Sequence, residues 1–496
     1  MSFKGLLAAA HLTPVELLGD AELTSIEIDS RLCKPGSLFI CMPGMTRESE
    51  GFIADAAAHG ASAVLAHSAA GIAAAQQAGL AGALVPHGAG RFSEAVWRLC
   101  DSFFSHPTRE MKMVAVTGTN GKTTTAWILR DLLSLLGVDA AYLGTLGYQS
   151  NHEKIVLENT TPFAVQLYNL IADARDKGIQ AIAMEASSHA LAQKRLDGIE
   201  FDAAVFTNLT QDHLDFHGTM EEYASAKHRL FRVLPTQTEK RFVAAFNMDD
   251  PVGLRWAQEQ SGPTVTYGIQ APEVDLRGVP VDVRVDGIKM NLVYRGEYEA
   301  NLRLGGSYNV ENALSAVAAM IALGFSLEEV VPLLPKVRPV PGRFEAIPND
   351  RGIGVMVDYA HTPDALEKLL DSVRKLQPRR VITVFGCGGD RDPNKRPKMA
   401  RAASERSDLT VLTSDNPRTE DPQSIVDQAA LGLIPGSDHV VILDRPEAVR
   451  YAVTHAEPGD VVVIAGKGHE DYQIVGRTKH TMDDRELARE ALGSPG

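Results

Sequence analysis

Cysteine is scarce in this chain: it occupies four of 496 positions, 33, 41, 100 and 387, and no two form a C-x-x-C pair. Disulfide frameworks and structural zinc sites need closely grouped cysteines, so the sequence argues against both. This usage is typical of a reducing compartment, and we expect a cytoplasmic protein.

Long apolar runs are missing as well. The nearest candidate is the N-terminal stretch M-S-F-K-G-L-L-A-A-A-H-L, which is too short to span a membrane and lacks a cleavage pattern. We expect this stretch to begin a helix that Thr13-Pro14 interrupts.

The chain has no excess of basic charge: 49 Lys and Arg stand against 63 Asp and Glu, a formal net charge of −14. Nucleic-acid partners are therefore not expected, because phosphate neutralisation needs basic patches. A hydrophobic fraction of 44% and a charged fraction of 23% are typical of a globular protein with an ample core. The length predicts about three domains.

Residues 1–108 predict a small α/β domain. Short strands at Ser37–Met42, Ala63–Ala66 and Gly82–Pro86 alternate with Ala-rich helical stretches. Ser105–Thr108 reads as a linker, because proline and short polar residues interrupt helices.

Residues 109–338 predict a second domain with a mostly parallel sheet. The apolar runs Ala181–Glu185 and Ala203–Thr207 are typical of parallel strands covered on both faces. From about Arg284 to Leu304 the pattern changes to alternation, which predicts antiparallel strands appended to the parallel sheet.

The run V-R-P-V-P-G-R, Val337–Arg343, marks the next boundary, and residues 339–496 predict a Rossmann-like, doubly wound α/β domain. Ligands of such sheets bind at the carboxyl ends of the strands, so substrate residues are expected there. The predicted strands are Val355–Asp358, Val381–Gly386, Leu409–Asp415, Val440–Asp444 and Val461–Gly466.

A phosphate-binding loop is predicted at V-T-G-T-N-G-K-T-T, between the apolar run Met113–Val116 and a periodic apolar helix. Lys122 would contact the terminal phosphates, and the Thr123 hydroxyl could bind Mg²⁺. Val116 stands where the usual loop has its first glycine. The predicted ATP-binding residues of the loop are Gly118, Thr119, Asn120, Gly121, Lys122, Thr123 and Thr124.

Three further groups in this domain are candidates for chemistry. Glu185 ends an apolar strand, where a carboxylate either caps the next helix or binds Mg²⁺. The segment Thr207–Gly218 crowds Asp and His residues after a buried strand, as a polar turn or as a functional site. Tyr223 and Lys227 share a helix face, and by itself Lys227 reads as a solvated surface lysine.

Taken together and in order, six motifs resemble the Mur ligase family along essentially the whole chain. They are G-T-N-G-K-T-T, N-T-T-P at Asn159–Pro162, M-E-A-S-S-H, L-T-Q-D-H-L-D-F-H, Y-x-x-A-K, and D-Y-A-H-T-P-D at Asp358–Asp364. The resemblance implies a three-domain fold with an N-terminal UDP-sugar-binding domain, a central ATPase and a C-terminal amino-acid-binding domain.

The resemblance also implies an activity. The enzyme would be an ADP-forming ligase of peptidoglycan precursor synthesis, with ATP as co-substrate and Mg²⁺ as cofactor. It would add meso-2,6-diaminopimelate to the D-glutamyl carboxylate of UDP-N-acetylmuramoyl-L-alanyl-D-glutamate through an acyl phosphate. Its partners would be these small molecules alone, and we expect a monomer.

For the ATPase site, the resemblance implies that Lys227 is carbamylated, which turns a cation into a carboxylate able to bind Mg²⁺. The implied catalytic residues are Lys122, Glu185, His213 and Lys227, and the implied metal ligands are Thr123, Glu185, His213 and carbamylated Lys227. Further ATP contacts are implied for Asn312, Arg343, Asp358 and His361.

For the UDP-sugar peptide, the resemblance assigns residues in the first two domains. Contacts of the uridine around residues 44–51 stay open, because Glu50-Gly51 stands where relatives often have Asp-Gly. The implied residues are Ile28, Ser30, Asn159, Thr160, Thr161, Ser187, Gln193 and Arg195.

For the amino acid, the decisive run is D-N-P-R at 415–418, which on its own reads as a Pro-containing turn with polar caps. In the family this run marks selection of meso-diaminopimelate, which carries a second carboxylate that lysine lacks. An arginine can pair with that carboxylate in bidentate fashion, and a site built so rejects an analogue that leaves it empty. The implied pocket is Arg391, Asp415, Asn416, Pro417, Arg418, Gly466 and Glu470.

Three alternatives remain. A lysine-adding ligase and a folylpolyglutamate synthetase share the scaffold, but the D-N-P-R run and the N-terminal domain argue against them. A nucleotide-sensing regulator without ligase activity would lack the metal lysine or the catalytic histidine, yet Lys227 and His213 are present.

Overall fold

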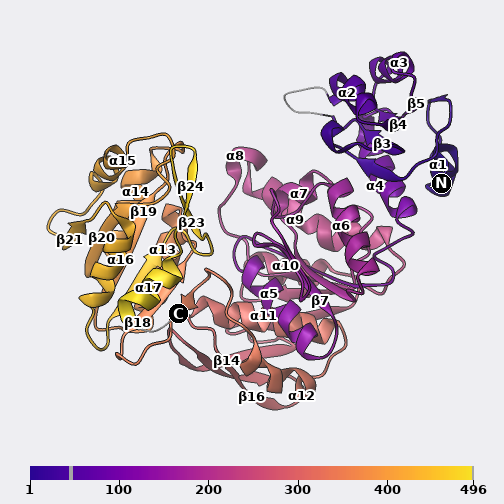
Figure 1. Ribbon diagram of the computed structural model, residues 1–496. Coiled ribbons are helices and arrows are strands. Elements are labelled where there is room, and N and C mark those ends of the chain that lie inside the picture. The colour runs from indigo at the N-terminus through magenta and orange to yellow at the C-terminus, as the bar shows by residue number, and fades with distance from the viewer. Residues whose placement is uncertain (44–48, 494–496) are drawn as a thin grey trace. The chain divides into compact units, whose positions relative to one another are not determined.

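The computed structural model of the protein describes residues 1–43 and 49–493 and confirms the mixed α/β fold class, with largely parallel sheets (Figure 1). The chain forms two compact units: unit 1 comprises Met1–Ala126 and Gly137–Val265, and unit 2 comprises Trp127–Leu136 and the chain from Thr266 onward. Among the described residues, no helix is both long and apolar enough to cross a bilayer.

The N-terminal part of unit 1 is a five-stranded sheet of order β1-β5-β4-β3-β2, in which only β1 runs antiparallel to its neighbour. The three predicted strands are confirmed as β3, β4 and β5, and the N-terminal helix ends before Thr13-Pro14. The elements are α1 (Phe3–Ala9), β1 (Glu16–Leu18), β2 (Ser25–Glu27), β3 (Ser37–Ile40), α2 (Ile53–Ala58), β4 (Ala61–Ala66), α3 (Ala69–Gln77), β5 (Ala81–Leu84) and α4 (Arg91–Phe103).

The predicted linker Ser105–Thr108 lies between α4 and the strand that begins the central part. There, β6 is flanked by β10 and β11 in parallel, as predicted. The elements are β6 (Lys112–Thr117), α5 (Lys122–Leu135), β7 (Ala140–Gly144), β8 (Gly147–Gln149), β9 (Lys154–Ile155), α6 (Ala164–Asp176), β10 (Ala181–Glu185), α7 (Ser188–Ala192), β11 (Ala203–Phe206), α8 (Leu214–His217), α9 (Met220–Arg232), β12 (Val243–Asn247) and α10 (Pro251–Glu259).

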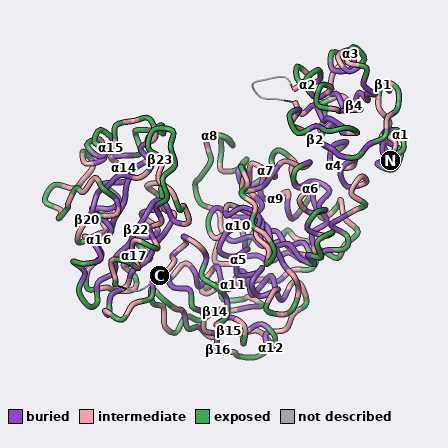
Figure 2. Tube along the Cα trace, viewed as in Figure 1, coloured by how far each residue is buried: buried purple, intermediate pink, exposed green. Residues whose placement is uncertain are grey.

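The strands β7, β10, β11 and β12 are buried along their whole length (Figure 2). The pairing register places Glu185, the last residue of β10, opposite Val116 of β6. Because both strands run in the same direction, the end of β10 lies beside the start of the phosphate loop.

Unit 2 begins with strands that pair mainly antiparallel, β14 with β15 and β15 with β16. The predicted alternation is confirmed, but its predicted start at Arg284 is wrong, because β14 already begins at Leu276. Gly278 and Pro280 weaken the strand signal in the sequence, because both residue types are depleted in strands. The pairing register also shifts next to Pro280. The elements are β13 (Thr264–Gly268), β14 (Leu276–Val283), β15 (Ile288–Val293), β16 (Glu297–Leu302), α11 (Tyr308–Ala322) and α12 (Leu327–Val330).

The C-terminal sheet has the order β17-β18-β22-β19-β20-β21, and the five predicted strands are confirmed as its parallel members. Apolar residues of these strands alternate between two cores, one with α13, α14 and α15 and the other with α16 and α17. The elements are β17 (Glu345–Ala346), β18 (Gly354–Asp358), α13 (Pro363–Arg374), β19 (Val381–Cys387), α14 (Lys395–Arg406), β20 (Leu409–Ser414), α15 (Pro422–Ala430), β21 (His439–Val441), α16 (Arg445–Thr454), β22 (Val461–Ala465) and α17 (Asp484–Leu492).

A two-stranded hairpin, β23 (Tyr472–Val475) and β24 (Thr478–Thr481), was not predicted from the sequence. Its backbone holds the D-N-P-R segment: the Arg418 N–H donates to the Ile474 carbonyl at 3.0 Å, and the Gly476 N–H donates to the Arg418 carbonyl at 2.7 Å. The hairpin therefore supports the predicted amino-acid pocket.

Asp460, at the entry to β22, is expected to stabilise the C-terminal sheet above pH 4. Its carboxylate accepts from Arg380 Nη2 at 2.6 Å and from Arg379 Nε at 3.0 Å. Burial raises the pKa of Asp460, but the hydrogen bonds from Arg380, the Glu457 N–H and Arg379 outweigh it and lower the pKa to about 2. A carboxyl with a lowered folded-state pKa adds stability above its unfolded pKa, and that stability is lost as pH falls from about 4 to about 2.

We expect Asp460→Asn to cost about 1–2 kcal/mol of unfolding free energy at pH 7, the lower value reflecting the half-exposed arginines. Denaturant unfolding at pH 7 and pH 3 measures this, and the difference from the natural protein should shrink at pH 3. Asp427→Asn, at an exposed position of α15, serves as the control. A pH-independent loss would contradict the linkage.

Candidate active site

The phosphate loop lies between β6 and α5 of the structure. Gly118 has φ +150°, and a Cβ there would lie 2.0 Å from Thr207 Oγ1, so the position demands glycine. Val116 is a buried residue of β6 that pairs with Glu185 and Val205. The missing first glycine is thus a strand position, and the turn begins only at Gly118.

Two lysines converge on the carbonyl of Gly118. Lys122 Nζ donates to it at 2.9 Å and to the Thr119 carbonyl at 2.8 Å, while Lys227 Nζ donates to Gly118 at 2.8 Å. The interpretation of Lys227 as a solvated surface lysine is wrong, because its exposure is 1%. Burial, and then the charge of Lys122, lower the pKa of Lys227 well below its usual value.

Tyr223 joins the loop to Lys227. Its hydroxyl is hydrogen-bonded to Thr119 Oγ1 at 3.1 Å, and the Lys227 ammonium lies 4.5 Å from its ring centroid. Burial raises the pKa of Tyr223 to about 12, so the phenol stays protonated at neutral pH. The predicted common helix face of Tyr223 and Lys227 is therefore a buried face that contacts the phosphate loop.

Glu185 is buried, and its carboxylate accepts from the Tyr142 hydroxyl, from the Thr145 N–H at 2.9 Å and from Thr145 Oγ1 at 3.3 Å. The alternative that Glu185 caps the next helix is wrong, because Ser187 is the cap of α7 and accepts from the Ala190 N–H. Glu185 is free of that role and remains a candidate metal ligand.

The donor set fits Mg²⁺ in part. The Glu185 carboxylate and the Thr123 hydroxyl are hard oxygen donors of the kind that Mg²⁺ prefers, and both are buried. Lys227 as an ammonium would repel a cation, and it becomes a ligand only as a carbamate. The part of the chain that the structure describes contains no cluster of three His, Cys, Asp or Glu residues that could hold a metal.

His213 lies in a left-handed turn, with φ +52°, just before α8, and its side chain is half exposed. Its ring centroid is 4.8 Å from that of His189, while His217 is buried and hydrogen-bonded to Ser188 Oγ at 3.0 Å. Burial lowers the pKa of His189 and of His217. The segment thus combines an accessible histidine, His213, with a structural one, His217.

The predicted peptide-binding residues Thr161, Gln193 and Arg195 form one cluster beside Glu185. Thr161 Oγ1 donates to the Glu185 carbonyl at 2.8 Å, and Arg195 Nη1 donates to the Thr161 carbonyl at 2.8 Å. Arg195 also donates to Gln193 Oε1 at 2.6 and 2.9 Å. Burial lowers the pKa of Arg195, whose remaining donors can serve an anionic ligand.

The other residues predicted for the UDP-sugar peptide are placed more loosely. Thr160 Oγ1 is 3.3 Å from Thr145 Oγ1, and Asn159 precedes it in a bend. Half-buried Ile28 follows β2, and Ser30 is buried and donates to Asp55 Oδ2 at 2.6 Å.

Of the segment 44–51, residues 44–48 lie outside the described residues. Glu50 is described, and its carboxylate accepts from the Ser68 hydroxyl at 2.6 Å and from the Ser68 N–H at 3.1 Å. Ser68 is the cap of α3, so the carboxylate of Glu50 is used by the fold.

In unit 2, the nucleotide candidates Arg343, Asp358 and His361 lie close together around Tyr359. Buried Asp358 accepts from the Phe344 N–H at 2.7 Å and from the Ala360 N–H at 2.8 Å. Burial raises the pKa of Asp358, against the nearby charge of Arg343. The Arg343 guanidinium lies 4.9 Å from the Tyr359 ring, and the His361 ring lies 4.6 Å from it.

Asn312 is a buried residue of α11. Its Nδ2 donates to Asn309 Oδ1 at 2.8 Å. This hydrogen bond links Asn312 to the preceding turn of its own helix.

The amino-acid candidates gather at the end of β20, as predicted for strand ends of a doubly wound sheet. Asn416 Nδ2 donates to Glu470 Oε2 at 2.9 Å, and Arg418 Nη1 donates to the Gly389 carbonyl at 2.8 Å. Gly389 allows this approach, because a Cβ there would lie 1.9 Å from the Pro417 carbonyl. A carboxylate and a guanidinium are thus held at one strand end.

Three further pocket candidates surround this strand end. Gly466 has φ +118°, and a Cβ there would lie 3.0 Å from Asp415 Oδ2. Arg391 is exposed, with Nη1 donating to the Asp390 carbonyl at 3.3 Å. The pocket therefore offers one half-buried guanidinium, Arg418, and one exposed guanidinium, Arg391.

Sequence reasoning missed several residues that build the site. Asn208 Oδ1 accepts from the Asn120 N–H at 3.0 Å, and Tyr142 and Thr145 hold Glu185. Lys467 is buried beside Asn416 and Glu470. The position of Asn208 directly after a buried strand was the available signal, whereas nothing in the pattern singled out the others.

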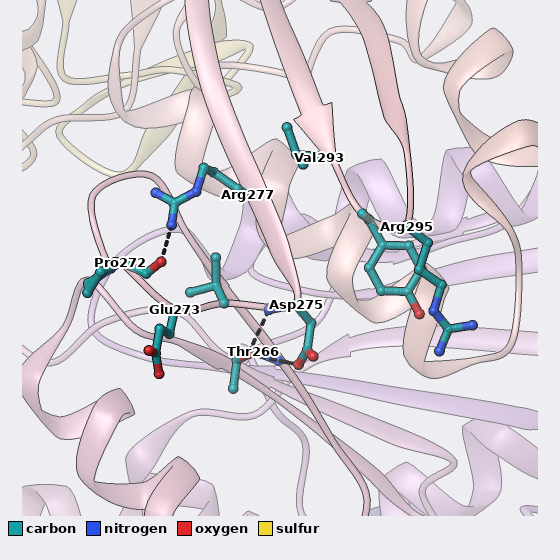
Figure 3. Close-up of a pocket in the computed structure, with 9 residues that line it drawn as sticks. Thr266, Pro272, Glu273, Asp275, Arg277, Val293 and Arg295 are labelled. Atoms are coloured by element: carbon teal, nitrogen blue, oxygen red, sulfur yellow. Dashed lines mark hydrogen bonds between the residues drawn. The ribbon is translucent and has the colours of Figure 1, made fainter.

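An open hollow of about 570 Å³ lies beside β14 and β15, and no predicted site residue lines it (Figure 3). Its polar groups serve the surrounding loop: Arg277 donates to the Pro272 carbonyl at 2.7 Å, and Asp275 accepts from Thr266 Oγ1 at 2.8 Å. We therefore place no chemistry there.

Known proteins match this chain along almost its whole length. The family models described as Mur ligase family, catalytic domain, as Mur ligase middle domain and as Mur ligase, glutamate ligase domain match residues 22–94, 116–320 and 342–468. A Geobacillus kaustophilus protein named UDP-N-acetylmuramoyl-L-alanyl-D-glutamate–2,6-diaminopimelate ligase is 42% identical over 482 residues, 96% of each chain.

A Thermosynechococcus vestitus protein of the same name is 43% identical over 499 residues, covering 99% of this chain and 98% of its own. A solved structure of a UDP-N-acetylmuramoyl-L-alanyl-D-glutamate–2,6-diaminopimelate ligase superposes with a TM-score of 0.70 at 35% identity, over 95% of each chain. With its motifs in family order and relatives of this identity over its full length, the chain belongs to the Mur ligase family.

Proposed function

We propose that this protein is an ATP-dependent ligase that adds meso-2,6-diaminopimelate to UDP-N-acetylmuramoyl-L-alanyl-D-glutamate in peptidoglycan precursor synthesis. The observation that carries the proposal is the strand end at Asp415–Arg418, where Arg418 and Glu470 are both fixed by hydrogen bonds. A guanidinium and a carboxylate suit the carboxylate and ammonium of the distal end of diaminopimelate. The names of the relatives agree with this substrate.

In the proposed reaction, ATP phosphorylates the D-glutamyl γ-carboxylate to an acyl phosphate, and the diaminopimelate amine displaces phosphate to form the amide. Lys122 would exchange its hydrogen bonds to the loop carbonyls for the transferring phosphoryl group. Arg195 and Thr161 would hold the peptide near Glu185, so that its carboxylate lies by the phosphate loop.

Bound Mg²⁺ would neutralise the approach of two anions, and Thr123, Glu185, His213 and carbamylated Lys227 would hold it. The buried site favours the neutral amine of Lys227, which is the form that reacts with carbon dioxide. Glu185 and Thr123 would add a carboxylate and a hydroxyl, both buried.

The proposal also covers the organisation of the chain. Residues 1–108 would bind the UDP-sugar, 109–338 would bind ATP and 339–496 would bind the amino acid, with ATP contacts from Asn312, Arg343, Asp358 and His361. Each matched family segment falls inside one of these ranges, which supports the division. We propose that the enzyme acts in the cytoplasm as a monomer.

Phosphate release with the UDP-sugar dipeptide tests the function, with meso-diaminopimelate compared with L-lysine. We expect kcat/KM to favour diaminopimelate by at least about 10²-fold, because lysine leaves the Arg418 guanidinium unpaired. A preference for lysine would refute the substrate, and ATP binding without any phosphate release would favour the regulator. Dipeptide-free reactions serve as the blank.

A further inference from the structure

Lys467 is a buried lysine that no step of the proposed reaction uses. It follows Gly466 at the end of β22, in unit 2, and its exposure is 0%. Lysines are almost never fully buried unless their charge is paired, so this position calls for a reason.

The contacts of Lys467 match an ammonium. Nζ donates to the Tyr472 carbonyl at 2.6 Å and to Asn416 Oδ1 at 3.0 Å, and it lies 3.6 Å from Glu470 Oε2. Three acceptors surround a group with three N–H donors. Burial lowers the pKa of Lys467, whereas the charges of Asp415 and Glu470 raise it.

The side-chain amide of Asn416 is hydrogen-bonded to both Lys467 and Glu470 and so links them. Its Oδ1 accepts from both Lys467 Nζ and the Ile474 N–H, the latter at 2.9 Å, so Nδ2 must face Glu470. Both contacts on Glu470, from Asn416 and from Lys467, involve Oε2. Glu470 Oε1 is therefore the oxygen that a ligand ammonium can take.

Lys467 is also the cation that balances this carboxylate. Arg445, the other buried cation nearby, is committed to Asp484 at 2.7 and 2.8 Å and lies 3.8 Å from Asp415. Without Lys467, Glu470 would lose the cation that lies 3.6 Å from its carboxylate. The pocket would then attract any bare ammonium more strongly.

We propose that Lys467 is a positioning residue that sets amino-acid specificity: its ammonium neutralises and orients Glu470, so that the pocket favours a distal end with both ammonium and carboxylate over a bare ammonium. A bare ammonium gains little beside a carboxylate that is already neutralised, and it leaves Arg418 unpaired. A zwitterionic end pairs with both groups. The inference rests on the proposed function, because it assumes this pocket binds the amino acid.

Lys467→Gln tests the role, because glutamine keeps a donor for Asn416 and removes the charge. We expect the ratio of kcat/KM for lysine to kcat/KM for diaminopimelate to rise about tenfold, with KM for ATP and for the UDP-sugar dipeptide unchanged. Lys479→Gln is the matched control, since exposed Lys479 contacts the Tyr472 ring at 4.3 Å and should leave the ratio as it is. Equal losses for both amino acids would mean a merely structural role and overturn the inference.

Adding Glu470→Gln to Lys467→Gln restores the charge balance, and we expect the gain in lysine use to disappear. If Lys467→Gln fails to fold, Glu470→Gln alone decides. In that variant the charge of Lys467 repels a bare ammonium, so the ratio of kcat/KM for lysine to kcat/KM for diaminopimelate should fall below that of the natural protein. A rise or no change overturns the inference. A natural protein that prefers lysine refutes the proposed function, whereas a preference for diaminopimelate with an unchanged variant ratio refutes only the role of Lys467.

Discussion

Lys227→Ala is expected to lower the ligation rate by about 10³-fold or more, while the fold and ATP binding persist. The side chain is buried, lies over the Tyr223 ring and reaches the Gly118 carbonyl of the phosphate loop. Its proposed carbamate supplies a carboxylate at that point, and alanine leaves a cavity there. Single-turnover phosphate release measures the loss.

The cavity allows a sharper test. Acetate or formate can enter the space that Lys227→Ala opens and place a carboxylate beside the phosphate loop, where Lys227 Nζ reaches the Gly118 carbonyl, so partial recovery of the rate is expected. Lys227→Met keeps the volume filled, and we expect no recovery with the same acids. Full unaided activity of Lys227→Ala would rule out the carbamate, and equal recovery of both variants would rule out a carboxylate at this position.

The burial of Lys227 shows where sequence reasoning fell short. The residue lies in the stripe Tyr223, Ala226 and Leu230 of α9, all of them buried. Helical spacing predicts which residues share a face, and the apolar members of that face already marked it as the buried one. The error came from weighing the lysine by residue type alone, since a buried lysine is rare unless the site uses it.

The parallel strands were predictable because their physics is local. Strands covered on both faces read as continuous apolar runs, and each run predicted in the C-terminal domain became a strand of one sheet. The position of Glu185 and of Asp415–Arg418 at strand ends followed directly. Functional groups at carboxyl ends of parallel strands are therefore within reach of the sequence.

The hairpin β23–β24 was not predictable on the same grounds. Its residues are half-buried or exposed, and they carry no apolar alternation. What holds it is the Arg418 backbone and the Asn416 side chain, both distant in sequence, together with the side chain of Lys467. Contacts of this kind have no periodic signature, so the support of the pocket appears only in the structure.

Arg418→Leu is expected to lower kcat/KM for meso-diaminopimelate by about 10²–10³-fold, because the distal carboxylate loses a bidentate partner in a partly buried site. KM for ATP should stay the same, and the weak use of lysine should change little. Arg401→Leu is the control, since Arg401 is an exposed arginine of α14 in the same domain.

Arg418→Lys separates charge from geometry. Lysine keeps the positive charge but offers a single point contact, so we expect an intermediate loss rather than recovery of the natural rate. Residue 418 pairs with the hairpin through its backbone N–H and carbonyl, which both substitutions keep, so we expect either variant to leave the strand end in place. Because the fold fixes the position of the guanidinium, kcat/KM of each variant should fall more for diaminopimelate than for lysine. Equal losses for both amino acids would instead place Arg418 outside the distal subsite.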